Sequence, residues 1–216
     1  MRLTILYSII ATVATTVIAT TISWPDTPFK TSGRQIVSQS GKNVVYAGVN
    51  WPGAADTMLP EGLQYQSIKN IVNKISSLGA NVIRLTYAIE MIDDIYSYSP
   101  NSTLQNSLIN ALGTANGTIV LHEILKKNSQ FTPYTTRLEV CTSLTGWTQV
   151  LILEQVFDAV AAECAKQQIY VHLDNHVSKA EWCCSNNDGN AWFGDTYFNV
   201  TNWRRGLAFM ADHVSQ

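Results

Sequence analysis

Charged residues are scarce in this sequence, and its basic residues form no cluster. Only 14% of the 216 residues are charged, and the formal net charge is −2. Proteins that bind nucleic acid need a patch of lysine and arginine to neutralise phosphates. We therefore expect no nucleic acid as a partner. The hydrophobic fraction of 46% is sufficient for the core of one or two ordinary domains.

Cysteine is also infrequent, and no metal-binding spacing is present. The four cysteines are Cys141, Cys164, Cys183 and Cys184, which could form two disulfides in an oxidising compartment. Cys183 and Cys184 are adjacent and are therefore poor partners for each other. No spacing of histidine or cysteine resembles a structural zinc site. We expect neither a metal nor a cofactor.

The first 23 residues have the pattern of a secretory signal peptide. A single cation, Arg2, precedes an uncharged run of Ile, Val, Ala and Thr, and small residues offer cleavage after Ala19 or near Ser23. A membrane anchor is the alternative, but the run is short for a span of ~20 residues and contains many threonines. Sequons, typical of secreted glycoproteins, begin at Asn101, Asn116 and Asn199. We predict a signal peptide over 1–23 and a secreted glycoprotein that has no membrane association after cleavage.

The rest of the chain alternates between strand and helix patterns. Apolar residues of the clearest helix recur at helical spacing between Ser67, a candidate N-cap, and Gly79, a stop signal. The first hairpin turns at Ser40-Gly41-Lys42, and its second arm is expected to continue from Val44 to Val49. The expected elements are a hairpin over 34–49, a helix over 68–78, a strand over 80–87, helices over 104–112 and 119–127, a strand over 169–176 and a helix over 202–213.

This alternation indicates parallel strands joined by right-handed crossovers. Polar residues gather where the strands end, at Asn50-Trp51, Arg84 and 174–176, and the active sites of (β/α)8 barrels are assembled at such ends. A doubly wound sheet follows a similar rule, but the sequence has no glycine-rich phosphate loop after a strand. We predict an α/β fold, an incomplete (β/α)8 TIM barrel of about three βα units preceded by a β-hairpin.

Four segments, in order, resemble the first half of glycoside hydrolase family 5, the cellulase-type secreted (β/α)8 barrels. The resemblance covers residues 34–213 apart from 140–155, and the hairpin resembles the element that closes the barrel floor in many members. The four segments are GVNWPG, NVIRLTY, VHLDNHVSKAEWCC and NWRRGLAFMADH. The resemblance implies hydrolysis of O-glycosyl bonds in a polysaccharide of the cellulose or β-glucan type, by a protein that we expect to be a monomer.

The same resemblance assigns roles to five residues. Arg84 matches the arginine that supports the nucleophilic carboxylate through hydrogen bonds. His176 matches the histidine that shapes the substrate-binding subsite. Trp51 is expected to line the cleft, and Asp174 and Asn175, beside His176, are the further candidates for substrate binding.

A retaining glycosidase needs two carboxyl groups about 5–5.5 Å apart, one to protonate the leaving oxygen and one to attack the anomeric carbon. In the family these are two glutamates that follow strands four and seven. Neither has a match in this sequence, because the fourth-strand Asn-Glu pair is expected after His213 and the sequence stops at Gln216. The other acids near the motifs are interpreted as loop charges, caps or supporting groups; they are Glu90, Asp93, Asp94, Asp174 and Glu181.

Residues 140–155 interrupt a helix pattern. Removing them joins Glu139 to the next helix and creates a capping box with Thr136. One helical face then contains Leu138, Phe157, Val160 and Cys164. The passage begins with Val-Cys and ends with Gln, which can be encoded by GTATGT and CAG, the sequences found at the two ends of an intron. Residues 214–216 begin with Val-Ser, which can be encoded by GTAAGT, another form of an intron start. We predict that 140–155 is a translated intron and that 214–216 opens a second; a genuine insertion in a short isoform is the alternative.

Two other functions stay open. The chain could be a non-catalytic secreted carbohydrate binder with an aromatic half-cleft of Trp51, Trp182 and Trp192. It could also be a secreted α/β fragment without a function.

Overall fold

The computed structural model describes residues 24–97, 99, 102–138, 155–183, 185, 187–190 and 192–214. The predicted signal peptide, the sequon at 101, most of the predicted insertion and the last two residues lie outside the described residues. The chain divides into two compact units between Val45 and Tyr46. In the described part, no helix is both long and apolar enough to cross a bilayer.

The first unit contains a small antiparallel sheet. Its strands are β1 (Lys30–Ser32), β2 (Gln35–Val37) and β3 (Asn43–Val44), paired in that order. Ile36 lies opposite Val44, which confirms the predicted hairpin. Its second arm is shorter than expected, because it ends at Val44 and the next strand begins only at Gly48.

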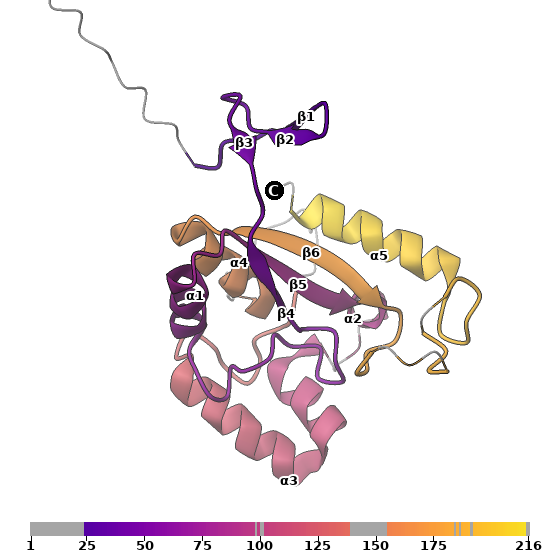
Figure 1. Cartoon of the computed structure of the whole chain (residues 1–216). Helices are drawn as coiled ribbons and strands as arrows, with labels where there is room; N and C mark the ends of the chain where they lie inside the picture. Colours follow the sequence, from indigo (N-terminus) through magenta and orange to yellow (C-terminus); the bar gives the residue numbers. More distant parts are fainter. Residues whose placement is uncertain are drawn as a thin grey trace, which may run out of the picture. The chain divides into compact units, whose positions relative to one another are not determined.

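The second unit contains a three-stranded parallel sheet with the order β4-β5-β6 (Figure 1). The strands are β4 (Gly48–Trp51), β5 (Val82–Ala88) and β6 (Tyr170–Val177). The helices are α1 (Ile68–Ser77), α2 (Ile89–Tyr96), α3 (Leu104–Lys127), α4 (Val156–Lys166) and α5 (Val200–His213). Helix α1 connects β4 to β5, and α2 to α4 connect β5 to β6, as parallel pairing requires. The predicted strand–helix alternation is confirmed.

The core lies on one face of this sheet. Alternate residues of β5, namely Ile83, Leu85 and Tyr87, are at most 2% exposed. They belong to one buried cluster with Val72 of α1 and Val160 of α4. Since successive side chains of a strand point to opposite faces, the other face of β5 is left for polar side chains.

Helix α1 forms where the sequence predicts, whereas α5 begins two residues earlier than predicted and α2 was not predicted. Ser67 caps α1 by accepting a hydrogen bond from the backbone N–H three residues later, at 3.2 Å, and Gly79 follows the helix with φ 80°. The helices predicted over 104–112 and 119–127 are both present, joined in α3 across a kink at Gly113, whose φ is 77°. A positive φ favours glycine because it has no Cβ.

The two ends of the predicted insertion meet at the start of α4. The carbonyl of Thr136 accepts from Val156 N at 3.1 Å, and that of Arg137 accepts from Phe157 N at 3.2 Å. If 140–155 were removed, both bonds would join residues four apart, the spacing of an α-helix. The Thr136 hydroxyl also donates to the side chain of Gln155, the residue in the place that Glu139 would take. The four apolar residues of the predicted face are all at most 2% exposed: Leu138, Phe157, Val160 and Cys164.

We predict that deleting residues 140–155 leaves the fold intact and extends α4 by about one turn, because the first helical hydrogen bonds already exist. Thermal unfolding followed by circular dichroism should give an unchanged or higher Tm. In the deletion variant, Thr136→Ala should lower stability by about 1 kcal/mol through loss of the N-cap. A deletion variant without cooperative unfolding would contradict the prediction.

Cys164 is a buried free thiol, so the four cysteines do not form two disulfides among themselves. Burial raises its pKa from 9.0 to about 12, with a smaller contribution from Glu163. The thiol therefore stays protonated in the folded chain at a pH where it begins to ionise in the unfolded chain. This contribution to stability is present below about pH 9 and is lost as the pH rises towards 12.

We expect Cys164 to resist alkylation by iodoacetamide at about pH 8 in the native chain and to react after denaturation, because the thiolate is the nucleophile. Peptide mass spectrometry gives the extent of reaction, and a Cys164→Ala variant identifies the signal. Rapid modification of Cys164 in the folded chain would show that the thiol is not buried.

Candidate functional site

Polar side chains occupy one face of the parallel sheet near its carboxyl ends. The register pairs Asn50 of β4 with Arg84 of β5, and Thr86 of β5 with Asp174 of β6. His176 follows Asp174 by two residues. Because side chains alternate along each strand, Asn50, Arg84, Thr86 and Asp174 share the face opposite to the apolar core. His176 lies at a register shift of β6 and joins them through its contact with Asp174.

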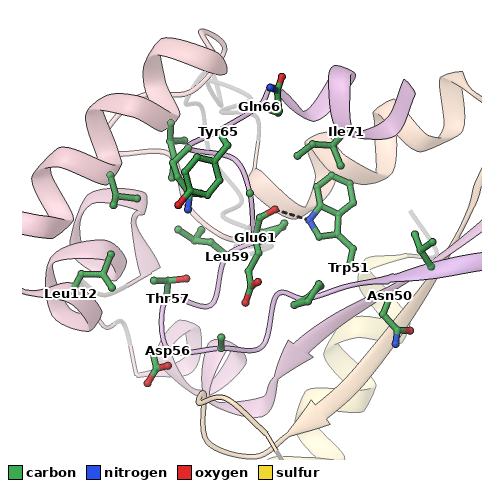
Figure 2. Close-up of a pocket in the computed structure, with 18 of the residues that line it drawn as sticks. Asn50, Trp51, Asp56, Thr57, Leu59, Glu61, Tyr65, Gln66, Ile71 and Leu112 are labelled. Atoms are coloured by element: carbon green, nitrogen blue, oxygen red, sulfur yellow. Dashed lines mark hydrogen bonds between the residues drawn. The ribbon is translucent and has the colours of Figure 1, made fainter. Parts of the chain in front are cut away.

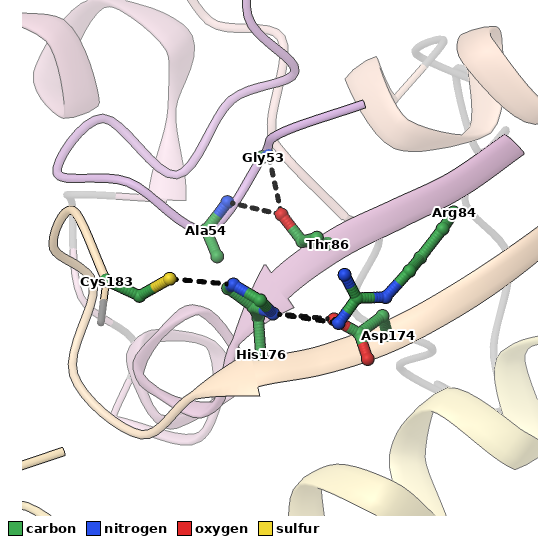
Figure 3. A network of polar contacts seen from close by, with 7 residues as sticks. All are labelled: Gly53, Ala54, Arg84, Thr86, Asp174, His176 and Cys183. Atoms are coloured by element: carbon green, nitrogen blue, oxygen red, sulfur yellow. Dashed lines mark hydrogen bonds and ion pairs between the residues drawn. The ribbon is translucent and has the colours of Figure 1, made fainter. Parts of the chain in front are cut away.

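Arg84, Asp174 and His176 form a polar network on this face (Figure 3). Asp174 Oδ2 lies 2.8 Å from Arg84 Nη2 and 2.8 Å from His176 Nδ1. Arg84 Nη2 is also 3.2 Å from His176 Nδ1. The side chains of Asp174 and His176 are 25% and 24% exposed, and that of Arg84 is 42% exposed. Asp174 thus neutralises Arg84 and orients the imidazole, while the guanidinium stays accessible to a ligand.

The second nitrogen of the imidazole is also held. His176 Nε2 lies 2.9 Å from Cys183 Sγ, and Cys183 is disulfide-bonded. A disulfide sulfur carries no proton, so Nε2–H is the donor of this contact. The ring is therefore fixed between a carboxylate of β6 and the loop that follows β6.

A cavity of about 140 Å³ lies over the network. Arg84, Thr86 and His176 line it from the sheet, and Ala54 and Trp182 line it from the loops that follow β4 and β6. Trp182 is 74% exposed. The cavity therefore combines a cation, a fixed imidazole and an exposed aromatic ring, which together can bind a polar ligand that has an apolar face.

The loop after β4 is anchored by Thr86. The buried Thr86 Oγ1 accepts from Gly53 N at 2.9 Å and from Ala54 N at 3.2 Å (Figure 3). A Cβ at Gly53 would lie 2.6 Å from the carbonyl oxygen of Thr86, so only glycine fits this close approach. The loop after β4, which forms one wall of the cavity, is thereby hydrogen-bonded to β5, the central strand of the sheet.

The loop after β6 is organised by Asn190, which is 7% exposed. Its Oδ1 accepts from Ser178 N at 3.0 Å and Lys179 N at 2.9 Å, and its Nδ2 donates to Lys179 O at 2.8 Å and Glu181 Oε1 at 2.9 Å. Asn190 and Thr86 position the cavity walls, but the sequence analysis did not identify them. Threonine in a strand and asparagine in a loop are too common to stand out.

Two of the predicted site residues lie elsewhere. Trp51 alternates with Asn50, so it lies on the core side of β4, where it is 4% exposed and its Nε1 donates to Glu61 O at 2.9 Å. It lines a larger apolar cavity of about 700 Å³ (Figure 2), which shares Asn50, Pro52, Ala55 and Glu61 with the cavity over the polar network. Asn175 alternates with Asp174, and its amide accepts from Trp203 Nε1 of α5 at 2.8 Å. The structure therefore brings together Arg84, Asp174 and His176, but neither Trp51 nor Asn175.

The other acids near the motifs make structural contacts. Glu90 Oε2 accepts from Ala180 N at 2.8 Å, Asp93 pairs with Arg205, and Asp94 pairs with the buried Arg137 at 2.6 Å. Glu181 accepts from the amide of Asn190. Within the described ranges, no group of three or more His, Cys, Asp or Glu could hold a metal ion.

Solved structures define the class of fold. The chain is similar to the catalytic domain of the major endoglucanase from Xanthomonas campestris pv. campestris, with TM-score 0.53 and 22% identity over 85% of this chain and 40% of that one. It is also similar to an endocellulase from Pyrococcus horikoshii in complex with cellotetraose, with TM-score 0.52, 18% identity and coverage of 85% and 38%. The chain therefore has the α/β fold of the part of these endoglucanase domains that it matches.

Curated relatives support the family resemblance. A glycosyl hydrolase 5 family protein from Chamaecyparis obtusa is 36% identical over 193 residues, which are 87% of this chain and 30% of that protein. An endoglucanase from Paenibacillus polymyxa is 32% identical over 66 residues, 30% of this chain and 17% of that one. No family model matches the chain. The resemblance to glycoside hydrolase family 5 is confirmed, and the chain spans less than a third of the length of these relatives.

We predict that Thr86→Val lowers the free energy of unfolding by about 2 kcal/mol or more, because two buried N–H groups lose their acceptor and each unsatisfied group costs about 1–3 kcal/mol. Urea denaturation measures the change. Thr86→Ser keeps the hydroxyl, so its free energy of unfolding should fall clearly less than that of Thr86→Val. Equal losses in the two variants would mean that the hydroxyl does not anchor the loop.

Proposed function

We propose that this chain is the N-terminal portion of a secreted glycoside hydrolase that cleaves O-glycosyl bonds in a polysaccharide of the cellulose or β-glucan type. The observation that carries the proposal is the Arg84–Asp174–His176 network at the carboxyl ends of a parallel sheet. It occurs in a chain that is 36% identical to a glycosyl hydrolase 5 family protein.

In this proposal, β4, β5 and β6 with their helices are the first three βα units of a (β/α)8 barrel. Both outer strands of the described sheet, β4 and β6, would then pair with strands that complete the barrel. The polar face would become the inside of the barrel, and the cavity over Arg84 would open at the carboxyl ends of the strands, where barrel enzymes bind their substrates.

The chain would supply residues that support the reaction, and not the two catalytic glutamates themselves. Arg84 has donors beyond the one held by Asp174, and these would hold the carboxylate that attacks the anomeric carbon. His176, whose ring is held at both nitrogens by Asp174 and Cys183, would shape the substrate-binding subsite. Cleavage that retains the configuration of the anomeric carbon requires two carboxyl groups about 5–5.5 Å apart. In this proposal these groups are two glutamates that lie outside these 216 residues. The chain alone is then inactive.

Exposed tryptophans support polysaccharide binding. Trp182 and Trp192 are 74% and 66% exposed, and flat aromatic rings can pack against the apolar faces of sugar rings. The same observation supports the second candidate, a non-catalytic secreted carbohydrate binder. Its half-cleft would use Trp182 and Trp192 but not Trp51, which is buried.

Secretion is part of the proposal, through the signal peptide predicted over 1–23. The disulfide-bonded Cys183 supports it, because structural disulfides persist mainly in oxidising compartments.

We expect the 216-residue chain to bind cellotetraose and to release no reducing sugar. Trp182→Ala should weaken binding about tenfold, or about 1.4 kcal/mol, in isothermal titration calorimetry. Tyr134→Ala is the matched control, because Tyr134 is equally exposed at 74% and lines neither cavity described above. Equal affinities of the two variants would contradict binding at the Arg84 cavity. Release of reducing sugar that disappears in Arg84→Ala would place the acid pair within this chain.

The spliced message separates the two candidate functions. An Asn-Glu pair encoded downstream of His213 is expected for the hydrolase. A message that terminates after Gln216 would favour the binder.

A further inference from the structure

The backbone of Glu61 is fixed to the end of β4. Glu61 N donates to the carbonyl oxygen of Pro52 at 2.9 Å, and its own carbonyl oxygen accepts from Trp51 Nε1 at 2.9 Å (Figure 2). Trp51 is 4% exposed, and the N–H of a buried indole usually has an acceptor. The two bonds close the loop after β4 at its base, so the position of Glu61 relative to the sheet is set.

The side chain of Glu61 is not used in these contacts. Glu61 is exposed, and its carboxylate points away from the Trp51 indole (Figure 2). Glu61 lines the cavity of about 140 Å³ over Arg84, which we call the Arg84 cavity. Because the backbone of Glu61 is already held, a ligand that binds to this side chain pays little for ordering the loop.

Two carboxylates line the Arg84 cavity, and they differ in their partners. Glu181 Oε1 accepts from Asn190 Nδ2 at 2.9 Å. Within the part of the chain that the structure describes, the Glu61 carboxylate has no hydrogen-bond or ion-pair partner. An ionised carboxylate has about four acceptor sites and no donor. Glu61 is therefore the carboxylate of this cavity whose acceptor sites are available.

Arg84 supplies the complementary groups. Its side chain is 42% exposed, and it has donors beyond the one that Asp174 holds. Arg84 belongs to β5, whereas Glu61 lies in the segment that follows β4. The cavity therefore offers donors from the sheet and acceptors from the loop. Neighbouring hydroxyls of a neutral sugar match this arrangement, because each hydroxyl both donates and accepts.

We propose that Glu61 is a substrate-binding residue of the Arg84 cavity, whose carboxylate accepts hydrogen bonds from hydroxyls of a neutral sugar unit. Trp51 is then a positioning residue, because its indole N–H holds the Glu61 backbone while its ring stays buried. The inference rests on the proposed function, since it takes the same substrate. It gives Trp51 an indirect role in binding, in place of the predicted contact with the cleft.

The test is isothermal titration calorimetry of the 216-residue chain with cellotetraose. Glu61→Ala should weaken binding about tenfold, because hydrogen bonds to an ionised group are the stronger ones. Glu61→Gln keeps one acceptor oxygen without the charge, so its affinity should fall less. Both variants are expected to fold, since Glu61 is exposed. Glu123→Ala is the matched control, because Glu123 is a carboxylate of α3 that lines neither cavity described above; its affinity should be unchanged.

A double-mutant cycle tests the role of Trp51. Trp51→Phe removes the indole N–H and keeps an aromatic ring, and it should weaken binding about threefold when Glu61 is present. In the Glu61→Ala chain the same change should leave the affinity unaltered, because no carboxylate is left to position. A purely structural role of Trp51 would lower the Tm of both chains without this difference in affinity.

Unchanged affinity of Glu61→Ala, together with weaker binding by Trp182→Ala, overturns the role of Glu61 and leaves the proposed function standing. Failure of the unaltered chain to bind cellotetraose overturns both. An equal loss of affinity from Trp51→Phe in the two chains overturns the positioning role of Trp51.

Discussion

The parallel pairing of β5 with both β4 and β6 is the constraint on which the second unit depends. It places Ile83, Leu85 and Tyr87 against the helices and leaves Arg84 and Thr86 on the opposite face. The apolar side contributes most of the burial, which favours the sheet. The polar side contributes little to folding and is free to carry charged groups. The alternation of side chains along β5 therefore separates the residues that stabilise the fold from those that can bind a ligand.

The polar face is held by interactions of different strength. The contact between Arg84 and Asp174 is partly exposed, so it contributes little to stability, and its main effect is to orient His176. The cavity walls depend instead on buried hydrogen bonds of neutral groups, those of Thr86 and Asn190. Losing such an acceptor leaves buried donors unpaired. The residues that hold the cavity are therefore distinct from those that face the ligand.

The segment between α3 and α4 combines two features. The carbonyls of Thr136 and Arg137 bond to the first residues of α4 in helical register, across the passage that interrupts the sequence. Those bonds also fix Arg137, whose side chain pairs with Asp94 at the end of α2. The helix start thus positions a buried cation.

Local patterns determined much of this protein. The cap at Ser67, the stop at Gly79 and the two helical stretches around Gly113 follow from short-range preferences. The grouping of Arg84, Asp174 and His176 follows from strand ends in a parallel sheet. Alternation along β4 and β6 places Trp51 and Asn175 on the face opposite to that group, and only the tertiary structure decided which of the two faces the helices cover. It also decided the roles of Thr86, Asn190 and Arg137, since their partners lie on other elements that no local pattern specifies.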